Sequence, residues 1–441
     1  MSPDVSARMR EDWNTRARED AHYYVAFGRK EQTEEEFFAT AAEIVNSLDA
    51  ELRRLPPGNW RSRRALEIGC GPGRLLKPMS RRFGEIHGVD VADEMIRLAR
   101  ARLHAIPHVH VHATNGAELS QFADSSFDFV YSYAVFQHIP DREVVMSYLH
   151  ETRRVLKPGG LARFQLNGLP KSAKTYDTWA GVRFAPEEIV EFTRSQNFQL
   201  LALEGTMTQY MWTSWIKREP GWRQAAARRA ALSSSTRIRR ITNAHSSEPV
   251  APNRGRFGSI SIWVENLPED LDLSGLTISV GGSPARATYI GPRDPGGVQQ
   301  INAVLAEGGA TGLMPVELLW FGEPLCRPAV LRIIPAGPDV PRIASVSDGV
   351  NLMSGLRIET GTVKVTIEDV VRPEAFSATI SGRPAEDVDA FCVDPLPRKY
   401  EINFRVPAGV EPGPHVLQMM LGRRRFAPVG IEVAPAPPVT G

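Results

Sequence analysis

The stretch "ALEIGCGPGRLL" at residues 65–76 begins as an apolar strand, passes through three glycines at alternate positions and resumes with helix-forming residues. Such a strand–loop–helix unit lies where doubly wound α/β folds bind ligands, at the carboxyl edge of the parallel strands. The loop that binds dinucleotides needs a further glycine where this chain has Arg74, and a carboxylate at Glu67 would repel a pyrophosphate. The stretch therefore favours a ligand with an ammonium group and no phosphate.

The residues on both sides of this stretch alternate between strand-like runs and helix-length segments. The strand-like runs are RALEIGC, IHGVDV, HVHVHAT, FDFVYSY, GLARFQLNG and FQLLALEG. This alternation predicts a mainly parallel sheet covered by helices on both faces. We expect the segments "APEEIVEFTRSQNFQLLALEG" and "QYMWTSWIKR" to close the sheet as its last helix and two antiparallel strands.

After about residue 250 the chain becomes rich in proline, glycine and short β-rich runs, and it repeats itself at a spacing of about 100 residues. The run "ISVGGSPA" (278–285) returns as "TISGRPA" (379–385), and "QQINAVL" (299–305) returns as "YEINFRV" (400–406). This pattern is typical of two immunoglobulin-like β-sandwiches. We therefore divide the chain into an α/β domain with a leading helical lid, a basic helix and linker, and two β domains, at residues 1–217, 218–255, 256–338 and 339–436.

Composition limits the partners of the protein. The 441 residues carry a formal net charge of +1, so no overall field attracts nucleic acid or an anionic membrane. The three cysteines are too far apart in sequence for a zinc site of CxxC type and do not suggest a disulfide framework. We therefore expect no metal site. The N-terminus is charged throughout and lacks the apolar core of a signal peptide, so we expect a cytoplasmic protein.

Several ordered motifs over roughly residues 10–217 resemble the class I S-adenosylmethionine-dependent methyltransferases, which have a Rossmann-like fold. S-adenosylmethionine carries an ammonium group and no phosphate, as the first motif favours. In that family the segment matched by "LEIGCGPG" wraps the methionine part of the cofactor. The resemblance assigns this role to Glu67, Gly69, Cys70, Gly71 and Gly73.

The next motif, "IHGVDVADEMIRLAR", places Asp90 at the end of the second strand. The resemblance implies that Asp90 binds both ribose hydroxyls, a task that suits a carboxylate because it accepts two hydrogen bonds at once. The alternative is a helix N-cap, for which Asp93 is the more natural residue. Val91 would then lie beside the adenine.

The segment "HATNGAELSQFADSSFDF" resembles the family's adenine-binding segment, although many relatives carry Asp-Ala where this chain has Asn115 and Gly116. The Asn115 amide would pair with an adenine edge, and the main-chain N–H of Ala117 would bind a ring nitrogen. The alternative for this Asn-Gly pair is a simple turn.

The fourth strand delivers Tyr131 and Ser132 to the same edge as expected cofactor contacts, followed by Phe136 and His138. In the family, residues after this strand flank the sulfonium and face the substrate, so Phe136 is either a substrate contact or a core residue. His138 is a candidate general base. Its alternative is a structural role, because methyl transfer depends on alignment and needs no obligatory base.

The segment from 166 to 184 leaves the carboxyl end of the fifth strand and is too long for a tight turn. It is our candidate for part of the acceptor pocket, with Asn167, Tyr176 and Trp179 as substrate contacts. Leading helices in this family commonly cover the cofactor, so we expect Tyr24 to act in a lid that excludes water. The alternative is that the aromatic residues of the leading helix pack against the sheet.

The two β domains resemble immunoglobulin-like repeats of bacterial surface and multidomain proteins. Such sandwiches bind through loops or edges, so they would recruit a glycan or protein, hold a homo-oligomer together or act as spacers. The sequence thus predicts an enzyme that methylates an oxygen or nitrogen of a small molecule or sugar. The alternatives are a non-catalytic cofactor-binding scaffold, which the intact motif residues argue against, and a nicotinamide-dependent oxidoreductase, which the residue at 74 argues against.

Overall fold

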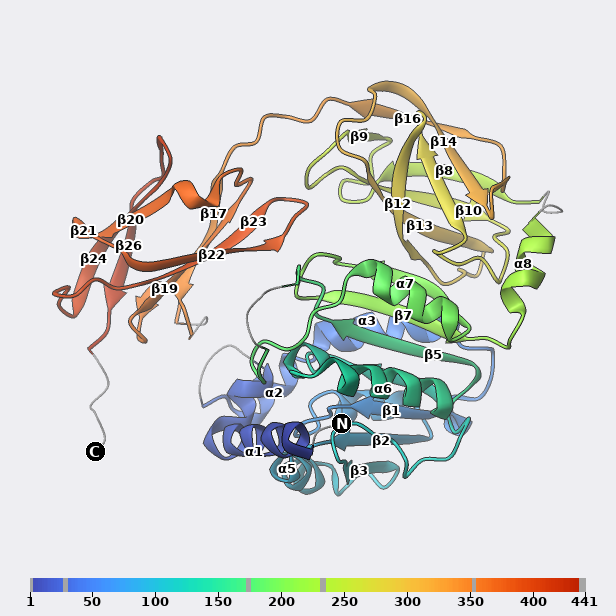
Figure 1. The fold of residues 1–441 in the computed structure, drawn as a ribbon, viewed down its shortest axis with the longest axis horizontal. Helices are drawn as coiled ribbons and strands as arrows, with labels where there is room; N and C mark the ends of the chain where they lie inside the picture. The colour runs from blue at the N-terminus through green and yellow to red at the C-terminus, as the bar shows by residue number, and fades with distance from the viewer. Residues whose placement is uncertain (1–2, 27–30, 172–175, 231–234, 351–353, 436–441) are drawn as a thin grey trace. The chain divides into compact units, whose positions relative to one another are not determined.

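The computed structural model describes residues 3–26, 31–171, 176–230, 235–350 and 354–435 (Figure 1). The chain forms two compact units. The first contains Met1–Ala21 and Glu34–Ala336, and the second contains His22–Thr33 and Gly337–Gly441. The first unit holds the α/β domain and the first β domain, whereas the second holds the second β domain. Among the described residues, every helix is too short or too polar to cross a lipid bilayer.

The α/β domain is built on a sheet with the strand order β3-β2-β1-β4-β5-β7-β6. Its strands are β1 (Arg64–Ile68), β2 (Glu85–Asp90), β3 (Val109–Ala113), β4 (Phe127–Ser132), β5 (Leu156–Leu166), β6 (Phe198–Glu204) and β7 (Met211–Lys217). The first five strands are parallel, and β7 runs antiparallel to both β5 and β6. The prediction of a mainly parallel sheet closed by an antiparallel pair is confirmed.

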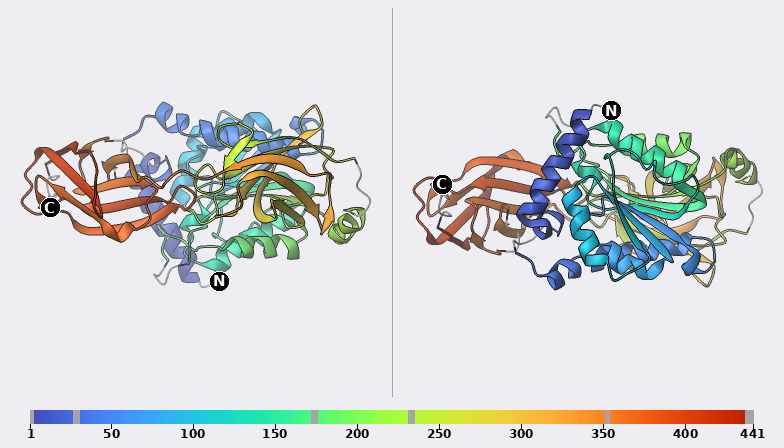
Figure 2. Two further views of the ribbon diagram at one scale, coloured as in Figure 1. Left: turned by 90° about the horizontal axis from the view of Figure 1, so that it is seen from above. Right: turned by 90° about the horizontal axis from the view of Figure 1, so that it is seen from below.

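Helices cover both faces of this sheet, as Figure 2 shows. The helices are α1 (Pro3–Ala26), α2 (Glu34–Ala39), α3 (Ala42–Glu51), α4 (Leu76–Met79), α5 (Asp93–Leu103), α6 (Arg142–Val155) and α7 (Pro186–Ser195). Buried residues of α3, α4 and α5 join one core with Phe129 and Tyr131, while those of α6 and α7 join the other with Leu66 and Val130. Neighbours in a strand point to opposite faces, so both cores follow from the apolar runs in the sequence.

The helix after the glycine loop is short. It ends after one turn at Met79, and a 3₁₀ turn follows at Ser80–Arg82. The Ser80 hydroxyl donates to the carbonyl of Lys77, and a ring nitrogen of His108 lies 3.0 Å from the Ser80 carbonyl. These side chains satisfy carbonyls that a longer helix would use, so the chain turns early towards β2.

The first β domain follows in the order β8-β10-β13-β12-β11-β14-β16-β9, with β15 beside β14. Its strands are β8 (Arg237–Asn243), β9 (Val250–Pro252), β10 (Ser259–Glu265), β11 (Leu276–Val280), β12 (Ser283–Ile290), β13 (Val298–Leu305), β14 (Gly312–Trp320), β15 (Glu323–Pro324) and β16 (Ala329–Ile334). The expected basic helix is α8 (Trp222–Ala230). The expected linker, however, contributes β8 and β9, because Ile241 and Ala251 are buried in the core of this domain.

The first β domain extends the sheet of the α/β domain. Tyr289 on β12 pairs with Ala202 on β6, and the N–H of Leu273 donates to the carbonyl of Leu200 at 2.9 Å. An open edge strand is a template for unwanted pairing. The first β domain therefore covers part of an edge that the α/β domain would otherwise leave open.

The second β domain consists of two sheets with the orders β17-β19-β23-β22 and β18-β26-β24-β20-β21, and β25 pairs with β24. Its strands are β17 (Arg342–Asp348), β18 (Arg357–Ile358), β19 (Thr362–Glu368), β20 (Phe376–Ile380), β21 (Arg383–Pro384), β22 (Glu386–Asp394), β23 (Lys399–Arg405), β24 (Gly413–Leu421), β25 (Arg424–Arg425) and β26 (Val429–Val433). In each β domain a short early strand pairs in parallel with the last strand. The structure thus gives both halves of the sequence repeat the same order of strands.

Candidate functional site

The loop between β1 and α4 adopts a backbone that suits only glycine. Gly69, Gly71 and Gly73 have φ angles of 71°, 50° and 88°. A Cβ on Gly69 would lie 2.3 Å from Val135 Cγ2, and one on Gly73 would lie 2.8 Å from Leu103 Cδ1. Side chains would therefore strain the backbone and collide with neighbours. The loop presents a bare main chain, as the alternate glycines predict.

Main-chain hydrogen bonds hold this loop against the end of β2. The N–H groups of Gly69 and Cys70 both donate to the carbonyl of Val89, at 2.8 and 3.0 Å. The N–H of Gly71 donates to Asp90 Oδ2 at 2.9 Å. Burial raises the pKa of the Cys70 thiol, so the thiol is neutral. The structure therefore brings together the first two motifs found in the sequence.

The side chain of Asp90 serves the loop rather than capping a helix. Its Oδ1 accepts from the N–H of Ala92 at 2.9 Å, and α5 begins at Asp93 with Ala92 as the N-cap. The N–H of Glu94 in the first turn is satisfied instead by Asn14 Oδ1, at 2.9 Å. Burial raises the pKa of Asp90, against the lowering effect of its backbone hydrogen bonds. Asp90 is therefore not the N-cap of α5, and its predicted contact with the ribose hydroxyls stays a prediction.

Glu67 lies in a buried polar group beneath the loop. The Tyr131 hydroxyl donates to Glu67 Oε2 at 2.9 Å. Burial raises the pKa of Glu67 to about 8, although Tyr131 and Arg74 oppose this shift. The Ser132 hydroxyl is already paired within the chain, because it donates to the carbonyl of Ile68 at 2.8 Å. At neutral pH Glu67 is therefore mainly protonated, and a positively charged ligand would favour its ionised form.

The Asn-Gly pair forms a turn. Asn115 Oδ1 accepts from the N–H groups of Ala117 and Glu118, at 3.0 and 3.1 Å. The Ala117 N–H, expected to bind an adenine nitrogen, is thus already paired within the chain. The turn uses both the side-chain oxygen of Asn115 and the N–H of Ala117. The adenine contacts of these two residues therefore stay predictions.

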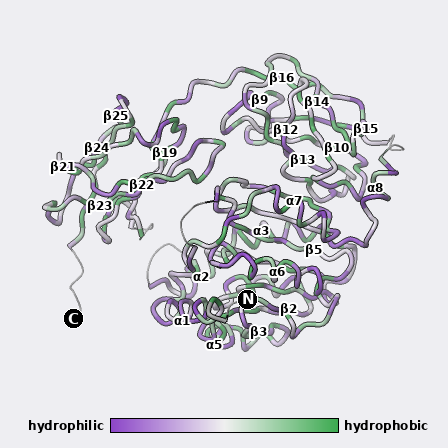
Figure 3. The backbone as a smooth tube through the Cα atoms, viewed as in Figure 1, coloured by the Kyte–Doolittle hydropathy of each residue, from purple (hydrophilic) through white to green (hydrophobic). Residues whose placement is uncertain are grey.

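Helix α1 lies over the carboxyl ends of β2 and β3. Arg10 Nε donates to the carbonyl of Val91 at 3.2 Å, and its Nη2 donates to the carbonyl of Thr114 at 3.1 Å. A Cβ on Gly116 would lie 3.0 Å from Val91 Cγ2 and 3.2 Å from Met9 Cε. The helix is mainly hydrophilic (Figure 3). The hydrogen bonds of Arg10 to main-chain carbonyls therefore contribute much of its attachment to the sheet. The leading helix therefore lies against the loops that follow β2 and β3, and its role as a lid stays a prediction.

Tyr24 lies beyond an interruption of α1 at Asp20, within the segment His22–Thr33 of the second unit. Its ring packs edge-on against Tyr23 with centroids 5.1 Å apart. Its role at the cofactor stays a prediction.

His138 is held by hydrogen bonds on both ring nitrogens. Nδ1 lies 3.0 Å from the carbonyl oxygen of Trp179, and Nε2 lies 3.2 Å from Gln137 Nε2. Because a carbonyl only accepts, Nδ1 carries the proton and Nε2 accepts from the Gln137 amide. Burial lowers the pKa of His138 to about 4. This arrangement favours the structural interpretation of His138 over the general base.

The segment expected to form the acceptor pocket begins at a buried asparagine. Asn167 Oδ1 accepts from the N–H of Leu169 at 3.2 Å, and its carbonyl accepts from the N–H of Phe184 at 2.9 Å. These bonds close the segment at its base. Asn167 therefore shapes the segment, and its predicted contact with substrate stays a prediction.

Aromatic side chains lie around an arginine of α1 in the same region. The Arg16 guanidinium lies 4.7 Å from the Trp13 ring centroid and 5.3 Å from that of Trp179. Trp179 is 46% exposed, and Tyr176 is partly buried against the core. The structure thus joins the lid to the predicted acceptor segment.

Phe136 points into the core. It is 1% exposed and packs against Tyr148 and Phe164, with ring centroids 6.0 and 5.4 Å away. Of its two interpretations, the structure favours the core residue.

Sequence reasoning missed the polar residues that connect these segments. Arg10 and Arg16 on α1 bond to main-chain carbonyls far along the chain. Gln165 Nε2 donates to Gln137 Oε1 at 2.9 Å, while Gln165 Oε1 accepts from the N–H of Ala134. A signal was present for Gln165, because it is a polar residue in the otherwise apolar end of β5.

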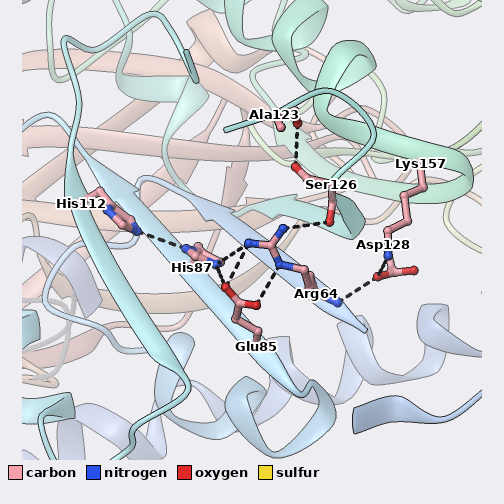
Figure 4. A network of polar contacts seen from close by, with 8 residues as sticks. All are labelled: Arg64, Glu85, His87, His112, Ala123, Ser126, Asp128 and Lys157. Atoms are coloured by element: carbon pink, nitrogen blue, oxygen red, sulfur yellow. Dashed lines mark hydrogen bonds and ion pairs between the residues drawn. The ribbon is translucent and has the colours of Figure 1, made fainter. Parts of the chain in front are cut away.

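A second titratable cluster contains residues near the start of β1 and β2 (Figure 4). His87 Nε2 lies 2.6 Å from Glu85 Oε1, and its Nδ1 lies 3.1 Å from His112 Nε2. Arg64 pairs with Glu85 at 3.0 Å. Among the described residues, no three His, Cys, Asp or Glu side chains are arranged to hold a metal ion.

Comparisons with known proteins agree with this geometry. Residues 66–164 match the family described as methyltransferase domain. Phosphoethanolamine N-methyltransferase 2 of Caenorhabditis elegans is 36% identical over 105 residues, 23% of this chain and 23% of that protein. The ubiquinone biosynthesis O-methyltransferase of Alkalilimnicola ehrlichii is 36% identical over 119 residues, 26% of this chain and 46% of that protein.

A solved structure of phosphoethanolamine N-methyltransferase 1 from Haemonchus contortus, in complex with phosphoethanolamine and S-adenosylhomocysteine, is similar to this chain with a TM-score of 0.39. It is 15% identical and covers 50% of this chain and 51% of its own. The chain spans about half or less of the length of the curated relatives named above. The region that carries the glycine loop, Asp90 and Tyr131 thus matches the methyltransferase domain family over residues 66–164.

Proposed function

We propose that this protein transfers the methyl group of S-adenosylmethionine to an oxygen or nitrogen atom of a small molecule or sugar. The observation that carries the proposal is the bare glycine loop flanked by two carboxylates, the buried Glu67 beneath it and the partly buried Asp90 beside it. This arrangement suits a ligand that is cationic at one end and carries hydroxyls at the other.

The residues present fit this cofactor. Each oxygen of Asp90 accepts one main-chain N–H, and a carboxylate has about four acceptor positions, so capacity for two ribose hydroxyls remains. Glu67 is poised to pair with the ammonium of the methionine part, with Tyr131 orienting it. The glycine loop supplies close main-chain contact. When bound, S-adenosylmethionine supplies an electrophilic methyl group on a cationic sulfur.

The protein's contribution to transfer is alignment and exclusion of water. Helix α1 covers the site through Arg10, and Arg16 with Trp13 and Trp179 links that lid to the acceptor segment. His138 holds the acceptor segment through the Trp179 carbonyl and stays neutral. Placing donor and acceptor in line supplies much of the rate in such a displacement. The named relatives include O- and N-methyltransferases, which supports an oxygen or nitrogen acceptor.

We further propose that the two β domains are immunoglobulin-like sandwiches that recruit a glycan or protein partner, with a homo-oligomer as another use of the same surfaces. The repeated strand order supports two copies of one module. The domain boundaries then lie near residue 236 and residue 338, where β8 and β17 follow.

Calorimetry with S-adenosylmethionine tests the proposal. We expect binding by the full chain and about 10- to 100-fold weaker binding by Asp90→Ala, because charge-assisted hydrogen bonds in a buried site are lost. Asp124→Ala is the matched control, since that carboxylate is 77% exposed and pairs with Arg154 rather than with a residue of the site. Equal affinity of Asp90→Ala and wild type would remove the assignment of Asp90.

The acceptor is best sought with the full chain, an isotopically labelled methyl donor and a metabolite extract. Label in a new product, detected by mass spectrometry, would establish transfer and identify the acceptor class. Tight donor binding with no labelled product in any extract would favour a non-catalytic scaffold.

A further inference from the structure

A buried polar cluster lies where the first β domain meets the methyltransferase domain, both within the first unit. We call it the Glu51 cluster; it consists of Glu51, Arg54, Arg163, Ser214 and Tyr289. Glu51 is 2% exposed, and its Oε1 accepts from the Tyr289 hydroxyl at 3.1 Å. Burial alone would raise the pKa of Glu51, but Arg54, Arg163 and the hydrogen bonds of Arg54 and Ser214 lower it to about 2. Glu51 is therefore a permanent buried anion that depends on its donors.

The cluster reaches into the central sheet through Ser214. The Ser214 hydroxyl donates to Glu51 Oε2 at 2.7 Å and accepts from Arg163 Nη1 at 2.9 Å. Arg163 also lies 3.4 Å from Glu204 Oε2, and its guanidinium lies 4.7 Å from the Trp212 ring centroid. The position of Arg163 over Trp212 is thus tied to the hydrogen bonds of Glu51.

An aromatic stack continues from Trp212 to the glycine loop. Trp212 and Tyr133 are stacked with centroids 5.5 Å apart and planes at 5°. Arg74 lies 5.6 Å from the Tyr133 centroid, and its charge lowers the pKa of Glu67 against the effect of burial. Arg74 is 7% exposed, and its Nε has no hydrogen-bond partner among the described residues. Its Nη1 donates to Thr40 Oγ1 at 3.1 Å, so its placement depends on that hydrogen bond together with the ring beside it.

We propose that Tyr289 of the first β domain is a positioning residue for Arg74 and Glu67 at the cofactor loop. This inference rests on the proposed function and adds a part of the chain outside the matched methyltransferase region to the cofactor site. Loss of the Tyr289 hydroxyl removes one donor from a buried anion, so the remaining donors must move to compensate. Arg163 donates to the Ser214 hydroxyl, which in turn donates to Glu51, so a shift of Ser214 also shifts Arg163. A shift of Arg163 changes the stack that Arg74 contacts.

The stack transmits such a shift because its members are close-packed and two of them are cations. The order is a guanidinium, two parallel rings and a second guanidinium, and each guanidinium is attracted to the face of the ring beside it. Protein interiors have few voids to absorb a displacement. Coupling of this kind between separate sites typically changes an affinity about 2- to 30-fold.

The test is calorimetry of S-adenosylmethionine with the full chain and Tyr289→Phe, which keeps the ring under Arg54 and removes the hydroxyl. We expect about 3- to 10-fold weaker binding. The matched control is Thr288→Val on the same strand, whose hydroxyl donates to the carbonyl of Asn302 and lies outside the Glu51 cluster. We expect Thr288→Val to bind as wild type does.

A double variant separates positioning from general destabilisation. If the effect travels through the stack, Tyr289→Phe in a Trp212→Leu background weakens binding no further than Trp212→Leu alone. Additive losses would overturn the inference. Should Tyr289→Phe not fold, Arg163→Lys serves instead, because lysine keeps the charge and loses the planar contact with Trp212; wild-type affinity in Arg163→Lys would then overturn it.

The outcomes distinguish the two proposals. Binding by the wild-type chain together with unchanged affinity in Tyr289→Phe overturns the role of Tyr289 alone. Absence of binding by the wild-type chain overturns the proposed function and the inference with it.

Discussion

The two β domains share one order of strands but differ in a single strand and in what that strand meets. In the first domain β12 is continuous, pairs first with β11 and then with β13, and also joins β6 of the methyltransferase domain. In the second domain the same position is divided into β21 and β22, so two separate sheets result. Tyr289 of β12 corresponds to Asp389 in the repeat, on a strand whose first residues are exposed. The first β domain, with a continuous β12, thus shares a sheet with the α/β domain. The second β domain, in which this strand is divided, belongs to the second unit.

The largest expected effect comes from removing the first β domain. We expect a chain ending at Lys217 to aggregate, because β6 would be left as an exposed edge strand. A chain ending at Ala336 keeps that edge covered and should remain soluble. Size-exclusion chromatography of the two chains compares them directly. A monomeric, folded chain 1–217 would show that the first β domain is as dispensable as the second.

Exchanging the residues at the corresponding position tests the same comparison at one site. Tyr289→Asp places a carboxylate beside buried Glu51 and should lower the free energy of unfolding by about 2–4 kcal/mol. The reverse exchange, Asp389→Tyr, lies on an exposed strand and should change it by less than about 0.5 kcal/mol. Urea denaturation of both variants provides the measurement. Equal effects would mean that the contact with Glu51 does not distinguish the two copies of the β domain.

Acid should unfold the two units at different pH. Burial is the largest cause lowering the pKa of both His87 and His138 to about 4, from the usual value of 6.5. These two histidines therefore bind fewer protons in the folded unit than in the unfolded chain, so their contribution to stability is complete above pH 6.5 and falls as the pH drops towards 4. Glu67, whose pKa is raised to about 8, opposes this trend. We expect a loss of about 2–4 kcal/mol over this range after allowance for partial exposure.

Tryptophan fluorescence isolates this effect, because all eight tryptophans lie in the first unit. The double variant His87→Gln and His138→Gln should flatten the dependence of that transition on pH. An unchanged pH dependence in the double variant would assign the acid sensitivity to other groups.

The α/β fold was predictable because its strands are apolar runs at regular intervals. Gly69 and Asp90 were predictable as a pair for a related reason, since the ends of parallel neighbours meet at one edge. β8 was not predictable, because "RIRRITN" offers few apolar residues and its pairing partner lies about 20 residues further along the chain.

The remaining differences at the site come from contacts distant in sequence. The partner of His138 Nδ1 is a carbonyl 41 residues away, which no local pattern reveals. Phe136 turns into the core because it begins a 3₁₀ turn (Phe136–His138) rather than continuing the strand. The side-chain oxygen of Asn115 accepts a hydrogen bond from its own turn. Whether Asn115 is a turn residue or an adenine contact could therefore be judged only from the folded backbone.

The pairing of Tyr289 with Ala202 also decides how this protein can be recombined. A graft that replaces the second β domain needs a joint after Ala336 and a new partner for His22–Thr33, because that segment belongs to the second unit. A graft that replaces the first must bring its own partner for β6, including a hydroxyl for Glu51. The methyltransferase region and the first β domain should therefore be exchanged between relatives as one cassette.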